Sequence, residues 1–238
     1  LAVCFDILAN EMAKARYMTG GQMNVPVVVR TANGAGSRFG AQHSQSVENW
    51  CMMIPGLKVV APSNPRDLIG LMAASIRDPD PVVFFEHKSL MATKGEVPDG
   101  EIVDELGKAK TGREGTDATI VSLAYMVPRA LEAADRLAED GISAEVIDLR
   151  TLVPLDTDAI LGSVTKTSRV FTVEENRRLC GWGAEIASIV AHEAFWDLDG
   201  PVVRITTPHL PLPAAEALED MAIPSVERIV RTVKENLD

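Results

Sequence analysis

One histidine stands among hydrogen-bonding side chains directly after a glycine-rich turn. His43 lies in the segment Gly40 to Ser46 with two glutamines and two serines, and the turn Asn33 to Gly36 precedes it. Amides and hydroxyls around an imidazole fix its tautomer, and the imidazole gains and loses a proton near neutral pH. We therefore predict that His43 acts as a general acid or base. A lone histidine is more often a surface or core residue, and its spacing alone leaves that alternative open.

The segments around His43 place it where sheet proteins bind ligands. Residues 25–29 form a continuous apolar run, which is typical of a buried parallel strand. The polar segment that carries His43 follows this run and predicts an exposed loop. Open α/β sheets bind ligands beyond the carboxyl ends of their strands. We therefore expect His43 to line a cleft at that edge.

Two glycine-rich segments do not have the features of phosphate-binding loops. The turn Asn33 to Gly36 lacks the third glycine and the lysine of nucleotide-binding loops, so we interpret it as a turn with positive φ. Gly181 to Gly183 precedes a helix, but Glu174 and Glu175 come just before it and would repel an anion. We expect this second segment to serve packing. Adjacent residues of a strand face opposite sides, so the two glutamates should not share a proton.

The other histidines carry weaker signals. We interpret His87 and His192 as structural or solvated residues, and His209 as part of a stiff proline-rich segment that suits an interface or a plain surface loop. The sequence contains no Gly-x-Ser-x-Gly, no His-Glu-x-x-His and no acid-rich metal cluster.

The composition describes an ordinary globular protein without a nucleic-acid partner. The 238 residues are 46% hydrophobic, and the net charge of −11 offers no basic face for phosphates. Cys4, Cys51 and Cys180 lie far apart in an odd number, which favours a reducing compartment over disulfides or zinc. No apolar run approaches the length of a transmembrane helix, and the start lacks the pattern of a signal peptide.

Alternating strand and helix patterns predict two α/β domains, each with a mainly parallel sheet covered by helices. Leu1 is not an initiator methionine, and residues 1–17 have the spacing of a buried helix, so we expect the beginning of a longer polypeptide to be missing. The expected strands are 25–29, 57–60, 81–85, 118–123, 144–148, 169–174 and 202–205, and the expected helices are 1–17, 65–76, 126–140, 157–167, 184–195 and 225–237.

Several motifs in one order carry a family resemblance. They are Ala15 to Gln22, Gly40 to Ser46, Pro55 to Pro62, Val146 to Asp156 and Gly183 to Ile186. With these motifs the chain resembles the β subunit of the thiamine-diphosphate-dependent 2-oxoacid dehydrogenases, the E1 component of pyruvate, branched-chain and acetoin dehydrogenase complexes.

The resemblance implies a domain division and a shared cofactor. Residues 1–92 would be the C-terminal part of a transketolase-type pyrimidine-binding domain, 93–113 a linker, and 114–238 a transketolase C-terminal domain. In this family the α subunit holds most of the thiamine diphosphate and its Mg²⁺, while the β subunit cups the aminopyrimidine. The glutamate that activates the aminopyrimidine is expected upstream of Leu1, so the resemblance assigns no cofactor-binding residue within this chain.

The resemblance also implies roles for particular residues. His43 matches the active-site histidine that faces the thiazolium and protonates or orients the substrate and the incoming lipoyl group. The family carries a monovalent cation, usually K⁺, bound largely by main-chain carbonyls. Those carbonyls fall on Val25, Val27, Val28, Ser75, Asp78 and Asp80. Asp80, where relatives often have asparagine, would add negative charge.

The implied function is oxidative decarboxylation of pyruvate, or action on a related 2-oxoacid or acetoin, with acyl transfer to lipoyl-lysine of the E2 acyltransferase. The implied partners are an E1 α subunit, in an α2β2 heterotetramer, and the lipoyl and subunit-binding domains of E2. The compartment would be the bacterial cytoplasm, or the mitochondrial matrix in a eukaryote. Two alternatives stay open: a single-chain transketolase or deoxyxylulose-phosphate synthase, and a non-catalytic assembly or docking fragment.

Overall fold

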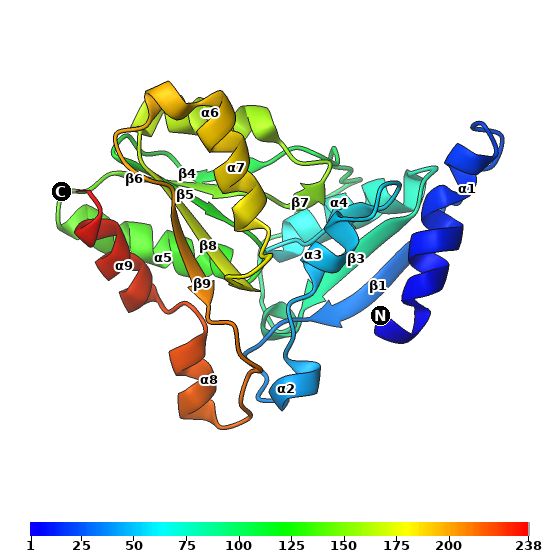
Figure 1. Cartoon of the computed structure of the whole chain (residues 1–238), viewed down its shortest axis with the longest axis horizontal. Helices are drawn as coiled ribbons and strands as arrows, with labels where there is room; N and C mark the ends of the chain where they lie inside the picture. Colours follow the sequence, from blue (N-terminus) through cyan, green and yellow to red (C-terminus); the bar gives the residue numbers. More distant parts are fainter. Residues whose placement is uncertain (238) are drawn as a thin grey trace.

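Two sheets form the framework of the structure, a computed structural model that describes residues 1–237 (Figure 1). The strand order is β1-β3-β2-β7 in the first sheet and β4-β6-β5-β8-β9 in the second. The strands are β1 (Val28–Asn33), β2 (Lys58–Val60), β3 (Val82–His87), β4 (Lys110–Arg113), β5 (Ala118–Ser122), β6 (Ala144–Asp148), β7 (Thr151–Val153), β8 (Val170–Arg177) and β9 (Val203–Thr207). All neighbouring strands are parallel except β2 with β7 and β4 with β6. The predicted α/β class with mainly parallel sheets is confirmed.

Helices cover both faces of the second sheet, with α5 and α9 on one side and α6 and α7 on the other (Figure 1). The α-helices are α1 (Ala13–Met18), α2 (Gly40–His43), α3 (Glu48–Met52), α4 (Pro65–Arg77), α5 (Met126–Glu139), α6 (Thr157–Thr167), α7 (Gly183–Glu193), α8 (Glu216–Ala222) and α9 (Val226–Glu235). Irregular helical segments are η1 (Ala2–Cys4), η2 (Ile7–Met12), η3 (Lys88–Leu90) and η4 (Phe195–Asp197). No helix within residues 1–237 is long and apolar enough to cross a membrane.

The first strand differs from its prediction in position and burial. It begins at Val28 rather than Val25, because Pro26 has no N–H for a ladder and the Val25 N–H instead donates to the Pro79 carbonyl. The strand is also not fully buried, since β1 is at the edge of its sheet and pairs only with β3. Side chains such as Arg30 are therefore exposed.

The opening helix is less buried than its spacing predicts. The segment runs through η1, η2 and α1 to Met18, but only Leu8, Ala9 and Ala13 are buried among its apolar residues. Val3 and Tyr17 are almost fully exposed. A single stripe of this helix contacts the rest of the described chain, which accounts for the difference.

Two short strands connect regions that the sequence separates. β4 lies at the end of the segment 93–113, which the sequence predicts to be a linker, and it pairs with β6 of the second sheet. β7 comes from the second half of the chain but pairs with β2 of the first sheet. The chain therefore crosses between the sheets more often than a simple division at one linker implies.

The two halves share one hydrophobic core. Its largest cluster joins Leu57 and Phe85 of the first half with Ile147, Ile160 and Trp182 of the second, all at most 2% exposed. Burial of such side chains contributes roughly 1.5–3 kcal/mol each, so the two sheets stabilise one another. A second cluster lies within the C-terminal half, between the sheet and the helices α5 and α9.

A buried arginine joins three parts of the chain. Arg150, which is 7% exposed, lies 2.5 Å from an oxygen of Asp104 and 3.7 Å from an oxygen of Asp67, and it donates to the Lys108 carbonyl. Asp67 comes from α4, Asp104 from the segment 93–113, and Arg150 follows β6. Arg66 contacts the same two carboxylates from a more exposed position, at 3.0 Å from Asp67 and 2.6 Å from Asp104, so Arg150 is their buried cationic partner.

We expect Arg150→Met to lower the free energy of unfolding by about 3 kcal/mol, because Asp67 and Asp104 lose their buried cationic partner and keep only the more exposed Arg66 and Lys110. Arg66→Met is the matched control: Arg66 lies 2.6 Å from Asp104, but its side chain is 36% exposed, so the loss should be about 1 kcal/mol or less. Urea unfolding measures both. Equal losses would contradict a special role for the buried guanidinium.

Candidate functional site

His43 lies at the end of α2, exposed at the mouth of a pocket of about 590 Å³. The pocket is lined by the last residues of β1, by Lys88 just after β3, and by the side chains of Phe39 and Trp50. β1 and β3 are parallel and pair Asn33 with His87 at their carboxyl ends. His43 therefore lines a pocket at that edge of the first sheet, as the sequence predicts. The segment is not the predicted exposed loop, however, because residues 40–43 form a short helix and Ser44 and Ser46 are buried.

One polar donor at this pocket has no partner within the described chain. Asn33 is 2% exposed, and its Oδ1 accepts a hydrogen bond from the Val47 N–H at 3.1 Å. This bond directs the amide so that Nδ2 is buried without a hydrogen-bond acceptor. A buried unsatisfied donor beside a pocket is suited to binding a ligand oxygen.

Lys88 brings a cation to the same pocket. Its Nζ donates a hydrogen bond to the His43 carbonyl and lies 5.8 Å from the centre of the Phe39 ring. Burial lowers the pKa of Lys88 from its usual value. None of the residues that line the pocket is an aspartate or a glutamate. Sequence reasoning missed Lys88, and its only signal was its place just after an apolar strand.

A buried carboxylate is hydrogen-bonded to the segment that carries His43. Glu175 comes from β8 in the second sheet, and one of its oxygens accepts hydrogen bonds from the Ala35 N–H at 2.8 Å and the Ser46 hydroxyl at 2.5 Å. Its other oxygen lies 2.9 Å from Nε2 of His87. Glu175 and His87 are 8% and 5% exposed.

The hydrogen bonds define the proton positions in this cluster. Nδ1 of His87 accepts from the Ser89 N–H at 3.2 Å, so the ring carries its proton on Nε2 and donates it to Glu175. The ring also stacks on Tyr125, with centroids 4.7 Å apart. Burial opposes ionisation of Glu175, but His87 and the hydrogen bonds from Ser46 and Ala35 outweigh it and lower the pKa of Glu175 below its usual value.

The glycines of the turn Asn33 to Gly36 permit a close approach. Gly34 has a φ of +89°, and a Cβ at this position would lie 1.9 Å from Nε2 of His87. Any side chain there would displace the imidazole from Glu175. The predicted turn with positive φ is confirmed, and it serves the packing of His87.

A second buried glutamate has the opposite pKa shift. Glu48, at the start of α3, is 4% exposed and accepts a hydrogen bond from the Asn176 amide at 3.2 Å. Burial, together with the charge of Glu175, raises the pKa of Glu48 to about 7. The cluster therefore holds one ionised carboxylate and one that stays protonated below neutral pH.

Glu174 faces away from this cluster, as the alternation of a strand requires. Its carboxylate accepts from Arg204 Nη2 at 2.6 Å and from the Gly183 N–H at 3.0 Å, at the first residue of α7. A Cβ at Gly181 or Gly183 would lie about 2.5 Å from this carboxylate. The predictions that these glycines serve packing and that the two glutamates do not form a pair are confirmed.

The remaining two histidines lie at the surface. His192 is exposed on α7, and His209 is exposed in the proline-rich segment, where it borders a small pocket with Cys180. His87 is buried and hydrogen-bonded, so its structural interpretation is confirmed and the solvated one is wrong.

The residues predicted to bind K⁺ lie around one loop. The Val25 N–H donates to the Pro79 carbonyl at 3.0 Å, and Val28 pairs with Val82. Ser75 and Asp78 lie at the end of α4, and the Asp78 N–H donates to the Ser75 carbonyl at 3.4 Å. The fold thus brings residues 25–28 and residues 75–80 of the predicted K⁺ site close together.

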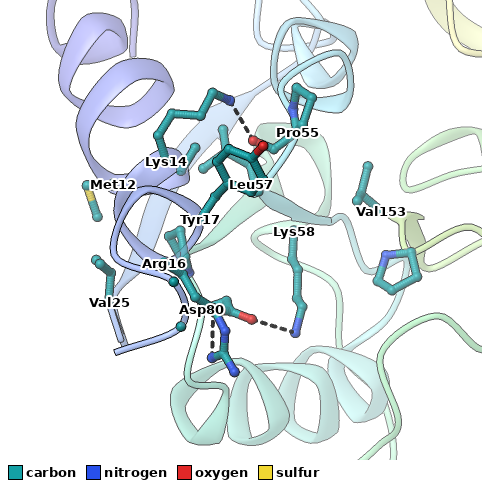
Figure 2. Close-up of a pocket in the computed structure, with 16 residues that line it drawn as sticks. Met12, Lys14, Arg16, Tyr17, Val25, Pro55, Leu57, Lys58, Asp80 and Val153 are labelled. Carbon is teal, nitrogen blue, oxygen red and sulfur yellow. Dashed lines mark hydrogen bonds and ion pairs between the residues drawn. The ribbon is translucent and has the colours of Figure 1, made fainter. Parts of the chain in front are cut away.

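Cationic side chains surround this loop. Lys58 lies 2.5 Å from a carboxylate oxygen of Asp78 and 4.0 Å from one of Asp80, and Arg16 lies 3.2 Å from Asp80. Figure 2 shows Arg16 and Lys58 on either side of Asp80, in a largely apolar pocket of about 960 Å³. Within residues 1–237 no three histidine, cysteine, aspartate or glutamate side chains group to hold a metal ion.

Comparisons with known proteins match both halves. The family model for the transketolase pyrimidine-binding domain matches residues 5–94, and that for the transketolase C-terminal domain matches residues 107–229. The chain is 48% identical to the acetoin:2,6-dichlorophenolindophenol oxidoreductase subunit beta of Bacillus subtilis, over 100% of this chain and 69% of that protein. It is 47% identical to the pyruvate dehydrogenase E1 component subunit beta of Rickettsia felis, over 97% of this chain and 71% of that protein.

The chain belongs to the family of E1 β subunits. This thiamine-diphosphate-dependent family also includes the mitochondrial pyruvate dehydrogenase E1 component subunit beta-1 of Arabidopsis thaliana, 49% identical over 96% of this chain and 64% of that protein. The chain therefore spans roughly two thirds of the length of these relatives. A solved structure titled split gene transketolase, inactive beta4 tetramer, matches with a TM-score of 0.79 and 26% identity, over 98% of this chain and 71% of that one.

We expect Glu48→Gln to stabilise the protein above neutral pH, because glutamine replaces a carboxyl that ionises in the folded state only near pH 7. Because the pKa of Glu48 is higher in the folded than in the unfolded state, the wild-type protein loses stability progressively from about pH 4.5 to 7. The variant should therefore exceed the wild type in free energy of unfolding by about 1–3 kcal/mol at pH 8 and by nearly zero at pH 4.5. Thermal unfolding at the two pH values measures it. Glu185→Gln, at an exposed position in the first turn of α7, is the control. Equal stabilities at pH 8 would contradict the expectation.

Proposed function

We propose that this E1 β subunit acts with an α subunit in an α2β2 heterotetramer that oxidatively decarboxylates pyruvate or a related 2-oxoacid, or acts on acetoin. The acyl group then passes to lipoyl-lysine of an E2 acyltransferase, whose lipoyl and subunit-binding domains are the further partners. The observation that carries the proposal is His43 at the strand-end pocket, in a chain 46–49% identical to acetoin and pyruvate enzyme β subunits. The bacterial cytoplasm or the mitochondrial matrix is the compartment proposed.

The pocket residues fit the group that the family uses. Thiamine diphosphate, held with Mg²⁺ mainly by the α subunit, supplies an electron sink when it is bound. On this chain, the unsatisfied Nδ2 of Asn33 offers a hydrogen bond to a ligand oxygen, and the rings of Phe39 and Trp50 offer apolar walls. His43 holds or delivers a proton at the pocket mouth, and Lys88 keeps its backbone in place.

We keep the domain division as part of this proposal. Residues 1–92 would form the pyrimidine-binding portion, 93–113 the linker and 114–238 the C-terminal domain. The family matches to 5–94 and 107–229 support two domains, although the second match and β4 both extend into the last residues of this linker. A transketolase-type transferase is the second candidate, since the matched solved structure is titled a split gene transketolase. Its 26% identity is well below that of the dehydrogenase β subunits, which favours the dehydrogenase.

A potassium ion would bind to main-chain oxygens of Val25, Val27, Val28, Ser75, Asp78 and Asp80. The carbonyls of Val25, Val27 and Ser75 each accept one hydrogen bond already, but a carbonyl oxygen has a second lone pair. Oxygen ligands suit a hard cation, and the Asp78 and Asp80 carboxylates offset the charges of Lys58 and Arg16.

We expect His43→Ala to lower kcat by about 100-fold or more, because it removes the proton-transfer group without removing a buried contact. The assay uses the full-length protein assembled with its α subunit, thiamine diphosphate and Mg²⁺, and compares pyruvate, branched-chain 2-oxoacids and acetoin with an artificial electron acceptor. His192→Ala changes an exposed histidine far along the chain and should leave kcat unchanged. Activity on none of these substrates, with transfer between sugar phosphates instead, would favour the transketolase candidate.

We expect K⁺ to raise the melting temperature, because a cation that binds only the folded state stabilises it by mass action. The measurement compares KCl with choline chloride at equal ionic strength. Asp80→Asn should reduce the difference between the two salts, since it removes a charge beside the cation. Identical melting temperatures in both salts would overturn the cation proposal and leave that for His43 intact.

A further inference from the structure

We propose that Glu175 is a positioning residue for His43, an inference that rests on the function proposed above for His43. Glu175 belongs to β8 of the second sheet, yet its three hydrogen-bonding partners, Ala35, Ser46 and His87, all belong to the first half of the chain. The side chain therefore reaches across the boundary between the halves and ends against Ser46 and His87, whose chain neighbours Gln45 and Lys88 line the pocket.

The contacts close the base of the loop that carries His43. One oxygen of Glu175 accepts from both Ala35 and Ser46, which stand at the two ends of the segment 35–46. A backbone bond from the Gly34 N–H to the Gln45 carbonyl, at 2.9 Å, lies beside this junction. His43 is on α2 within the closed segment, so the carboxylate holds together the two ends of the segment that carries it.

A separate ion pair holds the far side of the same loop. Arg38, two residues before α2, lies 2.6 Å from an oxygen of Glu219 and 2.7 Å from an oxygen of Asp220, both on α8 (labelled in Figure 1). The loop thus has one buried anchor at its base and one partly exposed anchor at its outer side. Losing the base anchor should loosen the loop without releasing it entirely.

The proton arrangement makes Glu175→Gln a selective change. If the glutamine oxygen keeps the bonds from Ala35 and Ser46, its amide NH₂ faces the Nε2–H of His87, and two donors meet. His87 cannot move its proton to Nδ1 without meeting the Ser89 N–H. Adding His87→Gln places an amide oxygen near the former Nε2 position, where it can accept from the glutamine at 175. The double variant should therefore restore the contact.

Glu174→Gln is the matched control. Glu174 is buried on the same strand, and its substitution likewise replaces a carboxylate by an amide. Its partners, Arg204 and the Gly183 N–H, lie on the opposite side of β8 from the His43 segment. A general loss of stability would affect both variants. A positioning effect on His43 would appear only with Glu175→Gln.

The test measures hydrogen exchange by mass spectrometry, and then kcat, in the full-length protein assembled with its partner subunit. We expect Glu175→Gln to speed exchange in the segment 36–46 by about tenfold or more and to lower kcat by a similar factor, because a hydrogen bond to a charged group is lost. The double variant with His87→Gln should recover most of both effects. Glu174→Gln should speed exchange in the peptide 181–190 and leave 36–46 unchanged.

The positioning role would be overturned if the Glu175→Gln variant exchanged hydrogens in segment 36–46 at the wild-type rate. It would also be overturned if Glu174→Gln raised the exchange rate in that segment as much as Glu175→Gln does. Should Glu175→Gln fail to fold, Ser46→Ala removes a single contact of the same carboxylate and should speed exchange in the same segment; unchanged exchange would again overturn the role. The exchange measurement does not depend on catalysis. An inactive wild-type assembly would therefore count against the proposed function alone.

Discussion

The burial of one ionised carboxylate between the two halves of the chain constrains the rest of the structure. A buried charge is costly unless donors surround it, and Glu175 meets this requirement only when Ala35, Ser46 and His87 converge on it. These partners belong to different segments of the first half, so the second sheet must meet the first in one orientation. The loop with His43 takes its place from that orientation.

The hydrophobic core and the Arg150 cluster enforce the same orientation by other means. Leu57 and Phe85 pack against Ile147 and Trp182, and this apolar burial stabilises the contact but does not by itself define the orientation of the two halves. The ion pairs of Arg150 restrict the orientation, because its guanidinium must reach carboxylates from α4 and from the segment 93–113. The halves behave as one unit because apolar burial and directional charge pairing act at the same boundary.

Local patterns predict most of the elements and the place of His43, but not the contacts that hold it. The alternation of apolar and polar runs gives the α/β class, and the polar segment after the first strand gives the strand-end pocket. Pro26 shifted the start of β1, and the edge position of that strand exposed it. Glu175 could not be paired with His87 from sequence, because 88 residues separate them and each is unremarkable in its own segment. The K⁺ carbonyls and the domain boundaries came from family resemblance and stay predictions.

The two glutamates of this boundary show how one environment produces opposite proton affinities. Glu175 is buried but has three donors that lower its pKa below the usual 4.5, so it adds stability above pH 4.5 and loses it as the pH falls below that value. Burial, together with the charge of Glu175, raises the pKa of Glu48 to about 7 despite donors from its own backbone N–H and the Asn176 amide, so this residue costs stability as the pH rises from 4.5. The cluster therefore accommodates a single negative charge. Because the first carboxylate already uses the donors nearest the His43 loop, the second stays protonated until the pH approaches neutrality.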